Sequence, residues 1–244
     1  MTMLLVGGVW KKIGLRLLGV VFLVATGLCA CAQSPATVVP TPRDGSWMAL
    51  HKGFLERAKK GHVDLLFLGD SITEGWNDNE VWKRFYGPRN AANFGIGGDR
   101  TEHILWRIQH GELEGIQPKV AVLMIGTNNV SSSTPDEIAQ GITAIVKDLR
   151  SRTPKTKILL LGVFPRDQKP SSDRDWLRSV NEKIAKLDDG SHVKFLDISQ
   201  AFVKPDGTIS PNIMPDYLHL SRKGYRIWAE AMEPTLWSLL DEPG

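Results

Sequence analysis

Short apolar runs alternate with longer amphipathic stretches along most of this chain. Residues 120–125 and 158–163 are continuous apolar runs, and residues 63–68 are interrupted by one polar side chain. Unbroken apolar runs of this length are typical of parallel strands that are covered on both faces. Residues 91–94 and 193–196 are weaker runs of the same kind. The pattern therefore predicts about five strands.

Helical periodicity fills the gaps between these runs. Residues 134–137 form a capping box with proline at the first helical position, which predicts the start of a helix. Four apolar stripes recur at helical spacing: Trp47, Leu50, Phe54 and Ala58; Ile138, Ile142, Ile145 and Leu149; Leu177, Val180, Ile184 and Leu187; and Tyr225, Trp228 and Met232, the last preceded by Ser221 as a cap. Strands that alternate with helices in this way predict a parallel sheet with helices on both faces. The expected fold class is α/β, a three-layer α/β/α sandwich.

The first 32 residues have a different composition from the rest of the chain. Lys11, Lys12 and Arg16 precede an apolar run at residues 17–28, and small residues follow it. The apolar run is too short to span a bilayer comfortably, so the pattern predicts a signal peptide over residues 1–32. An uncleaved membrane anchor is the alternative. We expect an exported bacterial protein that is periplasmic, envelope-anchored or secreted.

Two cleavage sites are consistent with the end of this leader. Ala30-Cys31-Ala32 is an A-x-A site that would release a soluble chain beginning at Gln33. Residues 28–31 also resemble a bacterial lipobox, which would leave Cys31 as a lipidated N-terminus and the only expected contact with a membrane. Residues 33–45 contain three prolines among small and polar residues and predict a flexible linker. One domain is expected over residues 46–244.

Composition limits the chemistry of the mature chain. The three basic residues of the leader account for the difference between 30 basic and 27 acidic residues. The remainder carries no net charge, so no nucleic-acid partner is expected. Both cysteines lie in the leader, so we expect no internal disulfide or thiolate metal site. The histidines other than His219 show no metal-ligand spacing, and we predict no metal.

Candidate catalytic groups stand where the apolar runs end. Ser71 follows the first run by a short turn and offers a nucleophile, which needs a base within hydrogen-bond reach. His219 is the expected base, and Asp216 is placed to orient its ring. Asp70 is expected to cap the turn by accepting hydrogen bonds from backbone N–H groups. Ligands of such sheets bind at the carboxyl ends of the strands, so we expect Ser71 and His219 to converge there.

Two further segments offer hydrogen-bond donors for a negatively charged oxygen. Gly98 follows the second run and lies just before an expected helix, where free N–H groups attract negative charge. Asn128 follows the third run and can aim a side-chain N–H at the same point. With the Ser71 amide, they predict an oxyanion hole of three donors. Asp99 and Glu102 are expected to cap the helix after Gly98.

These segments resemble the SGNH (GDSL) hydrolase family, whose four sequence blocks are matched by Ser71, Gly98, Asn128 and His219. Residues 93–108, NFGIGGDRTEHILWRI, look like the catalytic subunits of intracellular platelet-activating-factor acetylhydrolase, as do residues 69–73 and 215–221. The resemblance implies a flavodoxin-like fold and hydrolysis of small acyl esters without a cofactor. It also implies a substrate-binding acyl pocket at the matching positions Ile72, Thr127 and Leu218.

We expect a serine esterase that acts on short-chain, chiefly acetyl, esters through a Ser-His-Asp triad and an acyl-enzyme intermediate. The leader is foreign to the intracellular relatives, so an acetylated sugar or glycan ranks first as substrate. A lysophospholipid or platelet-activating-factor-like ester ranks second. A non-catalytic glycan-binding module on the same fold is the alternative from another class. A nucleotide binder is disfavoured because no phosphate-binding loop of the G-x-x-x-x-G-K-[ST] type is present.

Overall fold

The computed structural model describes residues 2, 7–8, 34–77 and 79–241. The chain divides into two units, Met1–Gln33 and Ser34–Gly244, and the second contains all the elements described below. The signal peptide predicted over residues 1–32 and its two cleavage sites lie outside the described residues, apart from residues 2 and 7–8. Within the described part of the chain, no helix combines the length and apolar character needed to cross a membrane.

Five parallel strands form one sheet in the order β2-β1-β3-β4-β5. The strands are β1 Leu65–Gly69, β2 Ala91–Gly95, β3 Val120–Met124, β4 Lys157–Leu161 and β5 Val193–Leu196. This order is that of flavodoxin-like sheets, in which the chain reverses direction across the sheet between β1 and β3. The predicted α/β class and the predicted strands are confirmed, with shifts of up to two residues at the strand ends.

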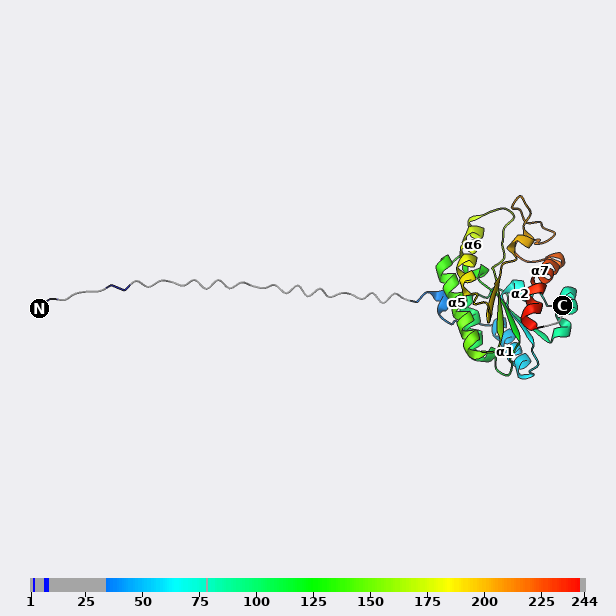
Figure 1. Ribbon diagram of the computed structural model, residues 1–244, viewed down its shortest axis with the longest axis horizontal. Helices are drawn as coiled ribbons and strands as arrows, with labels where there is room; N and C mark the ends of the chain where they lie inside the picture. Colours follow the sequence, from blue (N-terminus) through cyan, green and yellow to red (C-terminus); the bar gives the residue numbers. More distant parts are fainter. Residues whose placement is uncertain (1, 3–6, 9–33, 78, 242–244) are drawn as a thin grey trace. The chain divides into compact units, whose positions relative to one another are not determined.

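Helices cover both faces of this sheet (Figure 1). They are α1 Ser46–Lys59, α2 Ser71–Glu74, α3 Glu80–Phe85, α4 Thr101–Arg107, α5 Pro135–Arg152, α6 Ser172–Ile184 and α7 Arg222–Leu240. Short turns of helix add η1 Ala36–Val38, η2 Gly87–Arg89, η3 Ile108–Glu112, η4 Thr127–Asn129, η5 Ala185–Leu187 and η6 Ser199–Phe202. In Figure 1, α5 and α6 lie on one side of the sheet and α7 on the other. The three-layer arrangement follows from the apolar stripes, which the sheet buries on both faces.

Helix α1 buries most of its predicted apolar stripe, but His51 takes the place of Leu50. Trp47 and Ala58 are buried as expected, but Leu50 is 41% exposed and His51 is only 2% exposed. The His51 ring stacks on Trp47 and meets the edge of Trp106, with ring centroids 6.0 and 5.2 Å apart. The aromatic contacts bury His51 instead of Leu50, so the prediction for Leu50 was wrong. Burial lowers the pKa of His51, which favours the neutral ring.

Residues 34–45 pack against the domain, and their prediction as a flexible linker was wrong. Thr37 is 1% exposed. Its hydroxyl donates a hydrogen bond of 2.7 Å to the Glu137 carbonyl, and its own carbonyl accepts one of 2.9 Å from the Thr101 hydroxyl. These bonds satisfy polar groups at a buried position. The prolines that suggested a tether also limit the backbone freedom that is lost when the segment docks.

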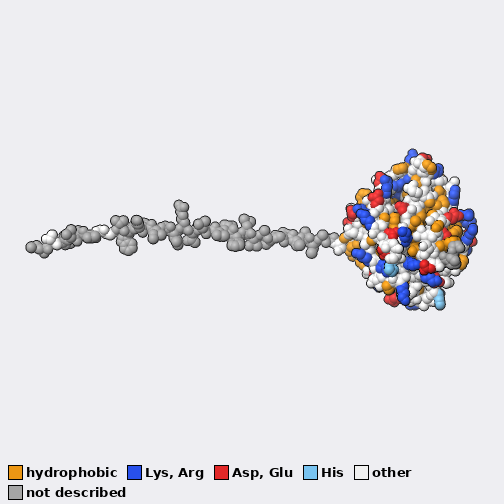
Figure 2. Space-filling view, in the orientation of Figure 1, with side chains coloured by type: hydrophobic (Ala, Val, Ile, Leu, Met, Phe, Trp, Pro, Cys, Tyr) orange, Lys and Arg blue, Asp and Glu red, His pale blue; other side chains and the backbone are white. Residues whose placement is uncertain are grey.

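The surface of the Ser34–Gly244 unit is mixed in charge. On the face shown in Figure 2, Lys and Arg side chains are interspersed with Asp and Glu, and apolar patches lie between them. Ion pairs also join neighbouring turns within single helices. Lys59 pairs with Glu56 at 2.7 Å in α1, and Arg226 pairs with Glu230 at 2.9 Å in α7. This distribution agrees with the even balance of acidic and basic residues outside the leader.

Candidate active site

The turn after β1 presents Ser71 at the start of α2. Asp70 is fully buried, and its carboxylate accepts a hydrogen bond of 3.0 Å from the Ile72 amide, which confirms its predicted capping role. Only glycine fits at Gly69, since a Cβ there would lie 2.0 Å from the Thr73 hydroxyl. Burial raises the pKa of Asp70 to about 7. The local structure therefore fixes Ser71 at the carboxyl end of a central strand.

Ser71, His219 and Asp216 are joined by two hydrogen bonds. The Ser71 Oγ lies 2.9 Å from Nε2 of His219, and Nδ1 of the same ring lies 2.7 Å from Oδ2 of Asp216. Oδ1 of Asp216 accepts backbone hydrogen bonds from Leu218, at 3.1 Å, and from His219, at 2.7 Å.

The ionised form of Asp216 dictates which ring nitrogen of His219 is free. Burial acts to raise the pKa of Asp216, but the bonds from the His219 ring and from the His219 and Leu218 amides outweigh it and lower the pKa to about 2. A carboxylate accepts only, so Nδ1 of the ring must carry the proton. Nε2 is then an acceptor that faces the Ser71 hydroxyl.

The turn that carries Gly98 is held from two sides. The Gly97 amide donates a hydrogen bond of 2.8 Å to the Glu74 carboxylate of α2, and the Gly97 carbonyl accepts one of 2.8 Å from the Arg43 guanidinium. Gly98 has a φ of +75°, a conformation that glycine adopts without strain. Among the described residues, the Gly98 and Ser71 amides have no acceptor. Both N–H groups are therefore available to a ligand.

Asn128 approaches the same turn from η4. One N–H of its side-chain amide donates a hydrogen bond of 2.9 Å to the Asp99 carbonyl, which fixes the orientation of the group. The second N–H stays available, because an asparagine amide has two donors. A cavity of about 410 Å³ at this point is lined by Gly98, Arg100, Thr127, Asn128, Ser131, Arg166, Asp173 and Leu218.

Of the three positions that the resemblance assigned to an acyl pocket, Thr127 and Leu218 line this cavity. Ile72 does not line it and is 1% exposed, within the main hydrophobic core. Its carbonyl accepts a hydrogen bond of 2.8 Å from the Tyr225 hydroxyl. Ile72 therefore anchors the serine turn to the hydrophobic core. Its part in an acyl pocket stays a prediction.

Asp99 does not cap α4, contrary to the prediction, and Arg100 occupies the N-cap position. The Asp99 carboxylate is fully buried and accepts hydrogen bonds from the Trp47 indole, at 2.7 Å, and from Nε of Arg107, at 3.0 Å. Arg107 is also fully buried and pairs with Glu112, whose pKa burial raises to about 7. A buried guanidinium needs a carboxylate partner more than a helix end needs a cap, so Asp99 serves Arg107.

Sequence reasoning missed the side chain that ties η4 to α4. Asn129 is 1% exposed. Its side-chain Oδ1 accepts a hydrogen bond of 3.2 Å from the backbone N–H of Thr101, and its side-chain Nδ2 donates one of 3.0 Å to the Glu102 carboxylate. Asn129 thus takes the capping function that was expected of Asp99. The sequence patterns singled out Asn128 as a donor, but they carried no signal for a capping role of the adjacent Asn129.

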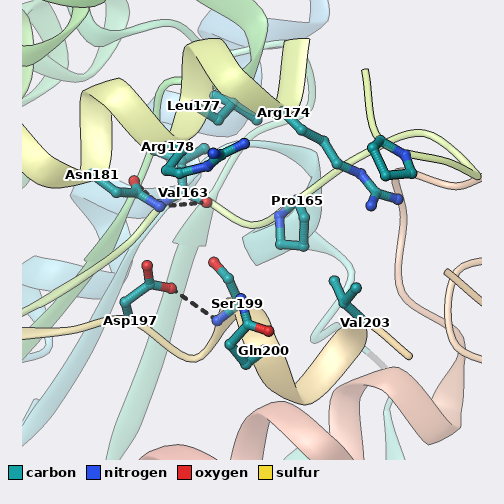
Figure 3. Close-up of a pocket in the computed structure, with 11 residues that line it drawn as sticks. Val163, Pro165, Arg174, Leu177, Arg178, Asn181, Asp197, Ser199, Gln200 and Val203 are labelled. Carbon is teal, nitrogen blue, oxygen red and sulfur yellow. Dashed lines mark hydrogen bonds between the residues drawn. The ribbon is translucent and has the colours of Figure 1, made fainter. Parts of the chain in front are cut away.

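A second cavity, of about 440 Å³, lies beside α6 and η6 (Figure 3). Several of its polar side chains are already hydrogen-bonded within the protein. Asn181 bonds both the amide and the carbonyl of Val163, at 2.8 and 3.1 Å, and Asp197 accepts a bond of 2.8 Å from the Ser199 amide. Arg174 donates to three backbone carbonyls. These groups shape the loops after β4 and β5, and neither Ser71 nor His219 lines this cavity.

The geometry defines the class of protein. A hydrogen-bonded Ser-His-Asp chain next to free N–H donors is typical of hydrolases that use serine as a nucleophile. Residues 67–227 match the model of the GDSL-like lipase/acylhydrolase family. The chain belongs to this family and is an acylhydrolase. In the described part of the chain, no group of three or more His, Cys, Asp or Glu side chains is arranged to hold a metal ion.

Relatives and solved structures resemble most of the chain. Subunit alpha1 of human platelet-activating factor acetylhydrolase IB is 42% identical over 210 residues, which span 86% of this chain and 90% of the relative. Rat subunit alpha2 is 42% identical over 200 residues, or 82% and 87% of the two chains. A GDSL-like lipase from Bacteroides thetaiotaomicron has a TM-score of 0.64 at 20% identity, covering 77% and 97%. An acetylxylan esterase from Geobacillus stearothermophilus has a TM-score of 0.58 at 19% identity, covering 73% and 94%.

Proposed function

We propose that this protein is an exported serine esterase that hydrolyses short-chain, chiefly acetyl, esters. The observation that carries the proposal is the chain of hydrogen bonds from Asp216 through His219 to Ser71, with distances of 2.7 and 2.9 Å. Distances in this range allow a proton to pass from the serine hydroxyl to the imidazole. Membership of the acylhydrolase family supports the same reaction.

In the proposed mechanism, the Ser71 Oγ attacks the ester carbonyl while Nε2 of His219 accepts its proton. Asp216 stabilises the imidazolium that forms, because its carboxylate is ionised and bonded to Nδ1. The tetrahedral intermediate collapses, and His219 returns the proton to the departing alcohol. Water then attacks the acyl-enzyme by the same route and releases the acid.

The negative charge of the intermediate is received by the amides of Ser71 and Gly98 and by the free N–H of Asn128. The proposal rests on the turn contacts described above, which hold Gly98 and Asn128 before the substrate arrives. Donors fixed in advance need no reorganisation when the charge develops, and one such donor is worth about 2.7–4 kcal/mol.

The lining of the cavity next to these donors favours a short acyl group. Leu218 is the only large apolar side chain among the lining residues, and the others are Gly, Ser, Thr, Asn, Asp and Arg. A fatty acyl chain gains about 0.8 kcal/mol for each CH₂ that it buries against apolar walls. A cavity with so few apolar walls would give a fatty acyl chain little of this burial free energy. An acetyl group has no CH₂ chain to bury and loses little in such a cavity.

An acetylated sugar or glycan is the substrate class that we place first, because the cavity is polar and the leader predicts export. A lipid ester of the platelet-activating-factor type is the second candidate, and the 42% identity to acetylhydrolase IB subunits favours it. The two can be separated by comparing kcat/KM for acetylated xylooligosaccharides and for a 2-acetyl phospholipid. Preference for the phospholipid would overturn the first ranking.

The central test is hydrolysis of p-nitrophenyl acetate by the domain of residues 34–244 and by its Ser71→Ala variant. We expect loss of turnover by about 10⁴-fold or more, as for removal of other serine nucleophiles. Ser131→Ala is the matched control, since Ser131 lines the cavity beside Gly98 and Asn128 and has no bond to His219. The melting temperature of both variants should match that of the wild type. Undiminished hydrolysis by Ser71→Ala would remove Ser71 from the mechanism.

Export is tested by the mass of the mature N-terminus purified from the native cell. A chain that begins at Gln33 would support the A-x-A site, and a diacylglycerol-modified Cys31 would support the lipobox. An intact Met1 on the bulk of the protein would contradict both forms of cleavage.

A further inference from the structure

The cavity beside Gly98 and Asn128 carries an arginine without a partner. Arg100 lines the cavity at the N-cap position of α4. Its backbone N–H donates a hydrogen bond of 2.9 Å to Nδ1 of His103. Among the residues that the structure describes, no acceptor or carboxylate pairs with the Arg100 guanidinium. Its five N–H donors therefore face solvent or a ligand.

A second arginine in the same cavity is held only by long contacts. Arg166 follows β4, and its side chain is 27% exposed. Its Nη1 lies 3.5 Å from the Thr127 carbonyl, and its Nε lies 3.7 and 3.9 Å from the carboxylates of Asp173 and Asp167. The Nε is buried and has no hydrogen-bond partner in the described part of the chain. An unpaired donor of this kind costs free energy unless a ligand satisfies it.

The lining residues have an excess of positive charge. Asp173 is the one carboxylate among the lining residues, and Asp167, which lies outside the lining, approaches Arg166 as well, so Arg100 is the guanidinium that stays unpaired in the described part of the chain. A neutral sugar or a bare acetyl group would leave the Arg100 guanidinium without a carboxylate or phosphate partner and Arg166 with long contacts only. Guanidinium groups bind carboxylates and phosphates through paired N–H···O bonds, which are stronger than bonds to neutral oxygens.

We propose that Arg100 and Arg166 form a subsite for an anionic oxygen group, a carboxylate or a phosphate, of the ester substrate. The inference rests on the proposed esterase function and narrows its substrate class to anionic acetyl esters. Gly98 and Asn128 line the same cavity, so the anion and the reacting carbonyl belong to one bound molecule. An acetylated uronic acid or an acetyl ester that bears a phosphate has this chemistry.

The test compares esters that differ only in charge, with the domain of residues 34–244. 4-Acetoxybenzoate and 4-acetoxybenzamide share the same size and a phenolic leaving group, and 4-acetoxyphenyl phosphate supplies the phosphate arm. We expect kcat/KM to be about tenfold higher for the preferred anion than for the amide at low salt, mainly through a lower KM, which corresponds to about 1.4 kcal/mol. Added NaCl should reduce this ratio.

Substitution of the two arginines assigns the preference to the subsite. Arg100→Gln and Arg166→Gln should each lower the anion-to-amide ratio by several fold, and the double variant should bring it to about one. Arg178→Gln is the control, since Arg178 lines the second cavity and pairs with Asp175. We expect the ratio to be unchanged in this variant. The relative kcat/KM of the carboxylate and phosphate esters decides which anion the subsite prefers.

Each outcome separates this inference from the proposed function. Equal, Ser71-dependent hydrolysis of charged and neutral esters would leave the esterase in place and overturn the anionic subsite. A preference for anions that survives in the double variant would overturn the assignment to Arg100 and Arg166. Hydrolysis of p-nitrophenyl acetate but of none of the three esters would overturn the anionic subsite alone. If the wild type hydrolyses neither p-nitrophenyl acetate nor any of the three esters, the proposed function fails and the inference fails with it.

Discussion

The Arg43 guanidinium donates a hydrogen bond of 2.8 Å to the carbonyl of Gly97, 54 residues away. Gly98 follows this carbonyl directly, and the guanidinium lies 3.3 Å from the point where a Cβ of Gly98 would stand. A second bond, of 3.2 Å, joins Arg43 to the buried Asp99 carboxylate. Arg43 thus clamps the residues on both sides of a proposed oxyanion donor, although it comes from the segment that the sequence assigned to a linker.

Arg43→Gln should therefore lower kcat more than it raises KM, because the Gly98 amide loses its fixed direction. A bond to a charged group contributes about 1.5–3 kcal/mol, so we expect kcat to fall about 10- to 100-fold. Steady-state kinetics on p-nitrophenyl acetate give the two parameters, and Arg43→Lys should restore part of kcat. Arg57→Gln is the control, since Arg57 of α1 donates an equal bond of 2.8 Å to the Gly61 carbonyl just after the helix. Equal kinetic losses in Arg43→Gln and Arg57→Gln would contradict a positioning role.

Asp216→Asn should abolish most turnover without unfolding the protein. The carboxylate accepts from Nδ1 of His219, whereas an asparagine amide can donate to that nitrogen and place the proton on Nε2. With Nε2 protonated, the ring cannot accept the Ser71 proton, and we expect kcat to fall by about 10⁴-fold with little change in KM. Single-turnover kinetics measure the acylation step directly. A loss below tenfold would show that Asp216 does not set the tautomer.

The adjacent Asn128 and Asn129 should separate catalysis from stability. Asn128→Ala removes a proposed oxyanion donor and should lower kcat by about 10²–10³-fold, with a small change in melting temperature. Asn129→Ala leaves the buried Glu102 carboxylate and the Thr101 amide without their partner, so it should lower the free energy of unfolding by about 1–3 kcal/mol. Kinetics and urea unfolding of both variants check the contrast. A loss of kcat in Asn129→Ala and a loss of stability in Asn128→Ala would show that Asn129 is the oxyanion donor and Asn128 the structural residue.

The buried Asp70 should make the protein less stable as the pH rises. Burial moves the pKa of Asp70 from 3.8 to about 7, so between these values the folded state holds a proton that the unfolded chain has lost. The free energy of unfolding then falls as the pH increases from about 4 to about 7. Asp70→Asn keeps an oxygen for the Ile72 amide and removes this titration. Its advantage in melting temperature over the wild type should therefore grow from pH 4.5 to pH 8.

Glu112 also lowers the free energy of unfolding as the pH rises, since burial raises its pKa to about 7. The Asp70→Asn variant should for this reason retain part of the pH dependence of stability. Asp136→Asn is the matched control, because Asp136 is a surface carboxylate that pairs with Lys183. A constant difference between Asp70→Asn and the wild type across this pH range would show that Asp70 does not titrate in it.

The central frame of this protein could be predicted from local sequence patterns. Apolar runs and helical stripes gave the strands, the helices and their alternation, because each pattern depends on neighbours within a few residues. The carboxyl ends of parallel strands meet at one edge of the sheet, so the motifs at residues 69–73 and 126–129 had to approach each other. The capping role of Asp70 was equally local, since its carboxylate bonds an amide two residues away.

Other features depended on partners that are remote in the sequence. The local sequence predicts that Asp99 caps a helix, but its carboxylate instead accepts hydrogen bonds from the buried Arg107 and Trp47. Leu50 and His51 are neighbours on α1, and the aromatic cluster of Trp47 and Trp106 decides which of them is buried. Helical spacing fixes the angle between side chains but leaves the rotation of the helix against its neighbours open.

The amino-acid sequence by itself determined the α/β architecture. It also determined that the nucleophile, the amide donors and the histidine lie at one edge of the sheet. The tertiary structure alone decided that the segment before α1 belongs to the domain, that Arg43 contacts both sides of Gly98, and that Asn129 caps α4. The physical reason is that local propensity acts over a few residues. Burial and charge pairing, in contrast, select among all the groups that folding brings together.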